Sequence, residues 1–298
     1  MCIPVSERVL KIGLPKGSLQ EATLAMFAKA GYRISVDERQ YKPNFDDEEI
    51  SGVLLRAQEM PMYVAHGELD CGLTGWDWIL ERGVENQVVE VTDLVYAKRG
   101  MRPYKWVLAA HESSDIHGPR DLQGKRIATE LVAATRKYLA RHGVEAEVEF
   151  SWGATEAKCP SLVDAIVEGT ETGSTLRANG LRIVDVLFES TTKLIANPQA
   201  WADEWKRGKI ETIALMLNAA LAAEHKVGLK MNVGPEDLAA VLAQLPALKN
   251  PTVSPLADDG WVAVETIVDT ALVVDLVPRL KAAGAEGIIE YPLNKVIP

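Results

Sequence analysis

The 298-residue chain lacks several features that mark particular classes of protein. Its three cysteines, Cys2, Cys71 and Cys159, are far apart and odd in number. This excludes a disulfide framework and a zinc site of paired cysteines, and it predicts a reducing, cytoplasmic setting. The sequence has no uninterrupted apolar run of ~18 residues, so no membrane-spanning helix is expected. The first residues also lack a charged segment followed by a long apolar core, so a secretory signal is not expected.

Positive charge is also scarce. Lys and Arg number 32 against 42 Asp and Glu, which gives a formal net charge of -10 at pH 7. Tight binding to a nucleic-acid backbone needs a basic face, so no nucleic-acid partner is expected. A nucleotide is not excluded, because a few amides, a lysine and Mg²⁺ hold phosphates whatever the global charge. A Walker phosphate loop is excluded, since the pattern G-x-x-x-x-G-K-[S/T] does not occur.

Short apolar runs alternate with helical patterns through most of the chain. Residues 9–14 predict a strand, and residues 19–30 predict a helix with Ser18 as its N-cap and Gly31 as its end. The same reading gives strands over 70–74, 106–110 and 126–129, and a helix over 135–142. Strands separated by helices predict an α/β fold with mostly parallel sheets.

The rhythm of the sequence changes near His225. The pattern then predicts strands over 226–233, 251–256, 261–268 and 286–291, with helices over 235–245 and 272–283. The order β-α-β-β-α-β is that of a ferredoxin-like unit.

The segment 164–176 carries the clearest chemical signal. An apolar strand runs into a loop of small and hydroxylated residues, and a short helix follows and ends at Gly180. Unpaired N–H groups and the dipole at such a junction favour an anion. Thr172, Ser174 and Thr175 add hydroxyl donors, so the segment predicts a phosphate-sized cradle.

Two acidic residues in this segment bear on the ligand. Glu168 and Glu171 would repel a bare phosphate, but a carboxylate can accept hydrogen bonds from ribose hydroxyls while amides hold the phosphate. A phosphorylated sugar is therefore one reading. The other is a glycine-containing loop whose acids are merely solvated.

Several motifs, in order along the chain, resemble those of ATP phosphoribosyltransferases. Glu168 to Leu176, followed by residues 177–181, resembles the phosphoribosyl-pyrophosphate loop of that family. Residues 14–19 resemble its N-terminal substrate loop, residues 55–61 its arginine-containing stretch, and residues 70–78 its D-x-G-x-T-G-x-D motif. The C-terminal module, ending in residues 291–295, resembles the regulatory domain of the family's long form.

The resemblance implies a pentosyl transfer in which adenine N1 of ATP attacks the ribose of phosphoribosyl pyrophosphate, with Mg²⁺ as cofactor. Adenine N1 has a free lone pair, so no protein nucleophile is required. Glu168 and Glu171 are then the candidate catalytic carboxylates. The candidate residues for binding phosphoribosyl pyrophosphate are Glu168, Gly169, Thr170, Glu171, Thr172, Gly173, Ser174, Thr175 and Leu176.

Candidate nucleotide-binding residues lie in the other motifs: Lys16, Gly17, Arg56, Gly75, Trp76 and Glu156. Alternative readings are an exposed Lys16, a surface ion pair between Arg56 and the acidic run 46–49, and a core position for Trp78. Glu59 and Glu168 stand where many family members have Asp, which keeps the charge but adds a methylene. The five histidines are scattered and predict no metal site.

The implied architecture is α/β, with two lobes similar to periplasmic binding proteins and a C-terminal ferredoxin-like (βαββαβ) regulatory domain. Lobe I would comprise residues 1–104 plus 191–225, lobe II residues 105–190, and the regulatory domain residues 226–298. The last would bind histidine as a feedback inhibitor, with residues 250–256 and 257–260 as candidate effector segments, and would help to assemble a homo-hexamer or a dimer. Two other hypotheses stay open: a non-catalytic two-lobed protein that binds a small ligand, and a regulatory subunit that has lost catalysis.

Overall fold

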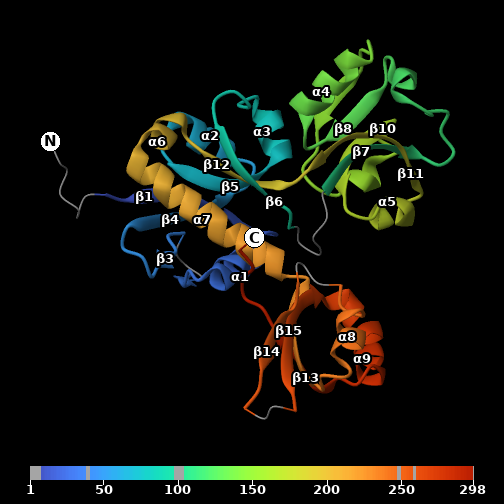
Figure 1. Cartoon of the computed structure of the whole chain (residues 1–298). Helices are drawn as coiled ribbons and strands as arrows, with labels where there is room; N and C mark the ends of the chain where they lie inside the picture. Colours follow the sequence, from blue (N-terminus) through green and yellow to red (C-terminus); the bar gives the residue numbers. More distant parts are fainter. Residues whose placement is uncertain (1–7, 38–40, 97–103, 247–249, 258–259, 298) are drawn as a thin grey trace. The chain divides into compact units, whose positions relative to one another are not determined.

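The computed structural model describes residues 8–37, 41–96, 104–246, 250–257 and 260–297. The chain divides into two compact units, Met1–Ala214 and Leu215–Pro298. The first unit contains two five-stranded sheets and the second contains one four-stranded sheet. Figure 1 shows the first two sheets with their helices.

The first sheet has the strand order β4-β1-β5-β12-β6. Its strands are β1 (Leu10–Lys16), β4 (Ile50–Arg56), β5 (Cys71–Gly75), β6 (Val89–Leu94) and β12 (Thr192–Ala196). The helices of this part are α1 (Gln20–Ala30), α2 (Met60–His66), α3 (Trp76–Arg82), α6 (Pro198–Ala202) and α7 (Glu204–Ala223), and β2 (Ile34–Ser35) pairs with β3 (Asn44–Phe45). Apolar residues of β1 such as Leu10, Ile12 and Leu14 are buried, which suits the position of this strand in the interior of the sheet, between β4 and β5.

The second sheet has the order β11-β7-β10-β8-β9. Its strands are β7 (Tyr104–His111), β8 (Arg126–Thr129), β9 (Glu147–Phe150), β10 (Ala165–Thr170) and β11 (Leu181–Ser190). The helices are η2 (Pro119–Leu122), α4 (Val132–Arg141), η3 (Thr155–Lys158) and α5 (Ser174–Ala178). The chain enters this sheet at Tyr104, leaves it at Ser190, and returns to the first sheet through β12.

The sheets are less parallel than the sequence predicts. The parallel pairings are β4-β1-β5 in the first sheet and β10-β8-β9 in the second. The strands that connect the two sheets, β7, β11 and β12, pair antiparallel with their neighbours. They do so because the chain passes from one sheet to the other and back, instead of returning through a helix to the same sheet edge.

The second unit contains the predicted βαββαβ order. Its elements are β13 (Lys226–Val233), α8 (Leu238–Leu242), β14 (Thr252–Pro255), β15 (Val262–Asp269), η4 (Thr270–Leu272), α9 (Val273–Ala282) and β16 (Glu286–Pro292). The sheet order is β14-β15-β13-β16, with every pairing antiparallel. Leu229, Met231, Leu276 and Leu280 belong to its buried core. The ferredoxin-like module is confirmed, and the compact units divide inside α7, before the predicted boundary at residue 226.

Other expectations also meet the structure here. None of the helices in the described part of the chain combines the length and the apolarity that a bilayer crossing needs. Cys71 and Cys159 are free and buried, whereas Cys2 lies outside the described residues. Of the candidate effector segment 257–260, residues 258 and 259 also lie outside the described residues.

Candidate active site

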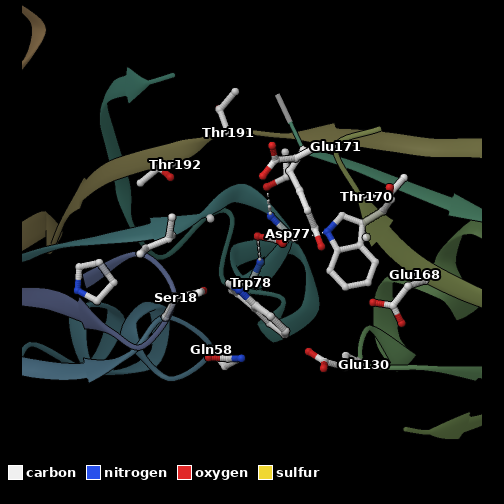
Figure 2. A pocket seen from close by; sticks show the side chains of 18 of the residues that line it. Ser18, Gln58, Asp77, Trp78, Glu130, Glu168, Thr170, Glu171, Thr191 and Thr192 are labelled. Atoms are coloured by element: carbon white, nitrogen blue, oxygen red, sulfur yellow. Dashed lines mark hydrogen bonds between the residues drawn. The ribbon is translucent and has the colours of Figure 1, made fainter. Parts of the chain in front are cut away.

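A cavity of about 750 Å³ lies in the first unit, with walls from both of its sheets. This volume is in the range of small-molecule sites. Ten of the predicted residues line it: Lys16, Arg56, Gly75, Glu168, Gly169, Thr170, Glu171, Thr172, Ser174 and Thr175. Figure 2 shows Ser18, Gln58, Asp77 and Trp78 together with Glu168 and Glu130 around the space.

Parallel strand pairing brings these groups together. Lys16 and Arg56 are register partners at the carboxyl ends of β1 and β4. In the second sheet, Val167 and Thr129 are register partners, so Glu168 and Glu130 come next on two neighbouring parallel strands. Ligands in open α/β sheets bind outside the carboxyl ends of parallel strands. The cavity therefore lies where the topology predicts chemistry.

The phosphate cradle is a tight turn between β10 and α5. Gly173 has a left-handed φ of 69°, and its N–H donates to Thr170 Oγ1 at 2.7 Å. Thr172 Oγ1 donates to Ser174 Oγ at 3.0 Å. The amide of Gly173 thus already has an acceptor, and Gly173 is buried and is not among the described residues that line the cavity. Leu176 lies in the hydrophobic core, so both residues contribute to the shape of the turn and not to the described cavity surface.

Carboxyl groups crowd the wall formed by the second sheet (Figure 2). Burial, together with the charges of the nearby Glu156 and Glu130, raises the pKa of Glu168 to about 7, although a hydrogen bond from Thr155 lowers it. Burial also raises the pKa of Glu130, as does the charge of Asp77. Such a cluster of desolvated carboxyl groups would stabilise a cation, or a positive charge on a ligand, that enters the cavity.

Asp77 connects the two sheets inside the cavity. Trp106 Nε1 donates to its carboxylate at 2.8 Å, and its own backbone N–H donates to Ser190 Oγ at 3.1 Å. Burial raises the pKa of Asp77, while the hydrogen bonds from Trp106 and other donors lower it. Asp77 lies on α3, one of the helices of the first sheet, whereas Trp106 and Ser190 lie on β7 and β11 of the second sheet.

Aromatic rings form another part of the lining. The rings of Trp78 and Trp106 meet edge to face at 6.3 Å, and those of Tyr104 and Trp106 do so at 6.1 Å. All three residues line the cavity. Their apolar faces suit a planar heterocycle, since stacking on aromatic side chains is tolerant of the base. Trp78 packs against the core, as the alternative reading of the sequence has it, and it also lines the cavity.

Two basic residues occupy the wall formed by the first sheet. Lys16 Nζ lies 3.7 Å from the centroid of the Tyr41 ring. Arg56 is exposed at the end of β4. The sequence left open an ion pair between Arg56 and the acidic residues 46–49. Three of those four acids have other partners in the structure. Asp46 pairs with Arg33 at 3.1 Å, and Asp47 and Glu49 pair with Lys209 at 2.7 and 2.6 Å.

Some predicted residues fall outside the lining of the described cavity. Gly17 has a φ of 106°, and a Cβ there would lie 3.2 Å from Arg56 Nη1, so the glycine makes room for that guanidinium. Trp76 packs against the core of the first sheet. Glu156 lies on η3, where its charge raises the pKa of Glu168. It is not among the described residues that line the cavity. Glu59 is the N-cap residue of α2.

The N-cap prediction for Ser18 is wrong. The residue at the N-cap of α1 is Leu19, and the turn is closed by the backbone, with Gln20 N–H donating to Gly17 C=O at 3.1 Å. Ser18 lines the cavity instead.

Several lining residues were not among the predicted site residues: Ser18, Gln58, Asp77, Tyr96, Tyr104, Trp106, Glu130, Ser190, Thr191 and Thr192. Asp77 had a signal, since it belongs to the segment 70–78. Glu130 also had one, because it follows a predicted strand. Tyr104, Trp106 and residues 190–192 lie at the two crossings between the sheets, which only the topology places beside the cavity.

The described part of the chain holds no cluster of three or more His, Cys, Asp or Glu side chains arranged for a metal ion. The donor set of the cavity nevertheless fits Mg²⁺, because its carboxylates are hard oxygen ligands. Mg²⁺ is usually held by one or two carboxylates together with substrate phosphates and water.

Comparisons with known proteins agree along the whole chain. Residues 56–219 match the family described as HisG, ATP phosphoribosyltransferase, and residues 223–295 match the HisG C-terminal domain. A curated relative named ATP phosphoribosyltransferase, from Thermodesulfovibrio yellowstonii, is 58% identical over 294 residues, which is 99% of this chain and 100% of that one. One from Chlorobaculum parvum with the same name is 59% identical over 292 residues, covering 98% and 99%.

A solved structure resembles part of the chain. It is the ATP phosphoribosyl transferase (HisG:HisZ) complex from Thermotoga maritima, with a TM-score of 0.60 and 25% identity. The similarity covers 70% of this chain and 99% of that one. The predicted α/β fold class is confirmed.

Proposed function

The chain belongs to the ATP phosphoribosyltransferase family, and we propose that its two-walled cavity is where the phosphoribosyl group passes from phosphoribosyl pyrophosphate to N1 of ATP. The products are phosphoribosyl-ATP and pyrophosphate, and the reaction is the first step of histidine biosynthesis. The observation that carries this assignment is one cavity with Lys16 and Arg56 on one wall and the turn 168–175 on the other. We assign lobe I to residues 1–104 plus 191–225, lobe II to 105–190 and the regulatory domain to 226–298.

The turn 168–175 is the phosphoribosyl subsite in this proposal. Thr172, Ser174 and Thr175 offer hydroxyl groups to the 5′-phosphate beside the start of α5. Glu168 and Glu171, which precede these residues in the chain, also line the cavity. In this proposal they accept hydrogen bonds from the ribose hydroxyls. The same carboxylates stabilise the positive charge that develops on the sugar as pyrophosphate departs.

The ATP subsite uses the remaining lining. Adenine packs against the partly buried Trp78, whose ring meets the buried Trp106 edge to face, while Lys16 and Arg56 hold phosphates. Adenine N1 already carries its lone pair, so the protein need not supply a nucleophile. Its main task is then to hold two anionic substrates in line. Such orientation supplies roughly 7–11 kcal/mol in the best intramolecular reactions.

Mg²⁺ belongs to the proposal as the cation of the substrate phosphates. When bound, it neutralises charge that gathers on the leaving pyrophosphate. Glu171, which lines the cavity directly before the hydroxyl groups of the turn, would be the protein carboxylate that joins the substrate phosphates as a ligand of Mg²⁺. Lys16 and Arg56 supply further positive charge from the opposite wall.

The C-terminal ferredoxin-like module is the regulatory part of the proposal. It binds histidine as a feedback inhibitor and contributes to a homo-hexameric assembly, with a dimer as the smaller alternative. The match of residues 223–295 to the HisG C-terminal domain supports this assignment. Inhibition at a separate site requires that histidine bind one global state of the protein more tightly than another.

A cytoplasmic location completes the proposal. Cys71 and Cys159 are buried free thiols, and burial raises the pKa of both. Unpaired cysteines of this kind suit a reducing compartment.

The test is an assay of the purified protein with ATP, phosphoribosyl pyrophosphate and Mg²⁺. We expect phosphoribosyl-ATP and pyrophosphate in equal amounts, and we expect neither when one substrate is omitted. A protein that binds the substrates without forming either product would instead be a binding protein or a regulatory subunit. The similarity over 99% of the chain to a relative named for the activity favours the enzyme.

A further inference from the structure

A line of polar side chains leads away from the cavity behind Glu168. Ser151 follows β9, Thr155 begins η3 and Lys158 ends it. Ser151 and Thr155 are each only 1% exposed, although both carry hydroxyl groups. Buried hydroxyl groups need partners, so their hydrogen bonds are part of what fixes this corner.

The strand register explains why this line reaches the site. Phe150 is the register partner of Thr129 in the parallel pair of β8 and β9, and Thr129 is the partner of Val167. Ser151 therefore follows at the same level as Glu130 and Glu168. Ser151 N–H donates to Thr129 C=O at 2.9 Å, which holds the start of the following loop against β8.

Three hydrogen bonds join the line. Lys158 Nζ lies 2.5 Å from Ser151 Oγ, and Ser151 Oγ lies 2.9 Å from Thr155 Oγ1. Thr155 in turn is next to the carboxyl group of Glu168, where its hydrogen bond lowers the pKa of that carboxyl.

The two ends fix the direction of the line. An ammonium group only donates, so Ser151 accepts from Lys158 and keeps its own proton to give. An ionised carboxylate only accepts, so Thr155 donates to Glu168 and must accept from Ser151. Every hydroxyl then points the same way, from the ammonium toward the carboxylate. Chains ordered in one direction strengthen each member.

We infer that Lys158 is a positioning residue for the transfer reaction, which through Ser151 and Thr155 holds the Glu168 carboxylate oriented toward the cavity. The inference rests on the proposed function of Glu168 at the ribose. Three titratable groups face Glu168 from neighbouring elements: Glu156 on η3, Glu130 at the end of β8 and Tyr104 on β7. Lys158 acts against the effect of these groups. None of these three brings a positive charge, whereas Lys158 does.

The test replaces Lys158 by Met, which keeps an unbranched side chain without the ammonium, and by Arg, which restores a donor. Without the ammonium, the Ser151 and Thr155 hydroxyl groups are no longer held in the direction that favours the charged form, so we expect the pKa of the Glu168 carboxyl to rise by on the order of one unit. We expect the acid limb of kcat against pH to move upward by about one unit in Lys158→Met. Turnover at low pH then falls about tenfold while turnover at high pH stays near wild type. Lys158→Arg should largely restore the profile.

Two further variants separate positioning from packing. Ser151→Ala interrupts the line without touching Lys158 and should give the same shift, with no added effect in the double variant. Lys125→Met removes another half-exposed lysine, which pairs with Asp164 at 3.4 Å, and should leave the profile unchanged. An unmoved acid limb in Ser151→Ala, or an equal loss of turnover at every pH in Lys158→Met, would overturn the inference.

A readout that needs no turnover keeps the inference distinct from the proposed function. The carboxyl carbon of Glu168 can be titrated by NMR in protein labelled at glutamate, with Glu168→Gln identifying the signal. We expect its midpoint to rise in Ser151→Ala and Lys158→Met. A wild-type protein that forms no phosphoribosyl-ATP would refute the proposed function, while an unmoved Glu168 midpoint would refute the positioning role.

Discussion

Gly173 holds the phosphate turn in a shape that a side chain opposes. Its φ is 69°, and a Cβ there would lie 3.1 Å from Arg177 Nη1 and 3.3 Å from Ile183 Cδ1. A β-branched residue is strained at this φ and would push the turn toward the cavity. We predict that Gly173→Val abolishes turnover, by at least about 100-fold, while the protein still folds. Steady-state kinetics with phosphoribosyl pyrophosphate, together with circular dichroism, measures this.

The matched control is Gly124, whose φ is 71°. Among the described residues no heavy atom lies within 4 Å of a Cβ placed there. Gly124→Val carries the same backbone strain without the crowding, so it should lower thermal stability and leave KM unchanged. If both variants lose turnover equally, the effect of Gly173 comes from strain in general and the phosphate site lies elsewhere.

Glu168 links activity to stability through its pKa of about 7, raised from 4.5 chiefly by burial. Between these two values the folded state binds more protons at this group than the unfolded chain does. Stability from this group therefore falls as pH rises from 4.5, and the loss is complete above about 7. We predict that Glu168→Gln stabilises the protein at pH 8 by on the order of 1–3 kcal/mol, has little effect near pH 4.5, and reduces kcat strongly.

Urea unfolding at the two pH values measures the stability difference. Glu189→Gln is the control, because Glu189 is half exposed on β11 and pairs with Lys105 at 3.1 Å. It should change stability by less than about 0.5 kcal/mol at either pH. A Glu168→Gln variant that is less stable than wild type at pH 8 would show that the carboxylate contributes favourable contacts there, contrary to the prediction.

The sequence indicated those site residues whose role depends on neighbouring residues in the chain. Thr172, Ser174 and Thr175 follow a strand and precede a helix, so their role could be predicted before their positions were known. Asp77 could not be assigned in the same way, because its partners Trp106 and Ser190 are 29 and 113 residues away along the chain. Such pairings depend on how the strands cross between the sheets, which no local pattern encodes.

At the scale of elements, α3 and α4 hold the two parts of the first unit together. The Glu81 carboxylate accepts hydrogen bonds from the backbone N–H groups of Ala133 and Ala134 at 3.1 and 3.0 Å. These groups belong to the first turn of α4, so Glu81 supplies from another helix the cap that Leu131, at the N-cap, cannot provide. The negative charge also complements the dipole of α4.

We predict that Glu81→Ala lowers the free energy of unfolding by about 1–2 kcal/mol. KM for both substrates should rise, because their subsites lie on the two parts that this contact joins. Chemical denaturation and steady-state kinetics measure the two effects.

Glu85 provides the control on the neighbouring turn of the chain. It pairs with Lys137 of α4 at 3.0 Å, but this is a side-chain ion pair with a half-exposed lysine. Glu85→Ala should cost less than about 1 kcal/mol and leave KM unchanged. Equal effects of the two variants would mean that the capping geometry contributes nothing beyond charge.

Element positions were more predictable than element directions. The strand predicted over 226–233 agrees with β13 (Lys226–Val233), and that over 286–291 falls within β16 (Glu286–Pro292). The helix predicted over 235–245 is shorter, α8 (Leu238–Leu242), because Asp237 N–H donates to Gly234 C=O in a turn before it. Direction is set by where the chain goes next, so antiparallel β7, β11 and β12 could not be inferred from apolar periodicity.

At the scale of the whole molecule, the net charge of -10 and the proposed binding of polyphosphates are compatible. The cavity brings Lys16 and Arg56 to one wall by strand register and places hydroxyl groups on the other. Local donors therefore act on the phosphates, while the global charge disfavours extended polyanions. Added salt should weaken substrate binding only modestly, in contrast to its effect on a protein that binds nucleic acid.

The division into two units bears on regulation. The first unit, Met1–Ala214, contains the cavity, and the ferredoxin-like sheet lies wholly in the second, Leu215–Pro298. If residues 226–298 carry the histidine site, an enzyme that ends after α7 should keep measurable turnover and lose inhibition by histidine, since an effector can shift an equilibrium only through a site that it binds. Inhibition curves with and without residues 226–298, at matched substrate saturation, measure this. Adding the isolated segment back is the control for indirect effects, and a soluble, active truncation that histidine still inhibits would place the effector site in the first unit.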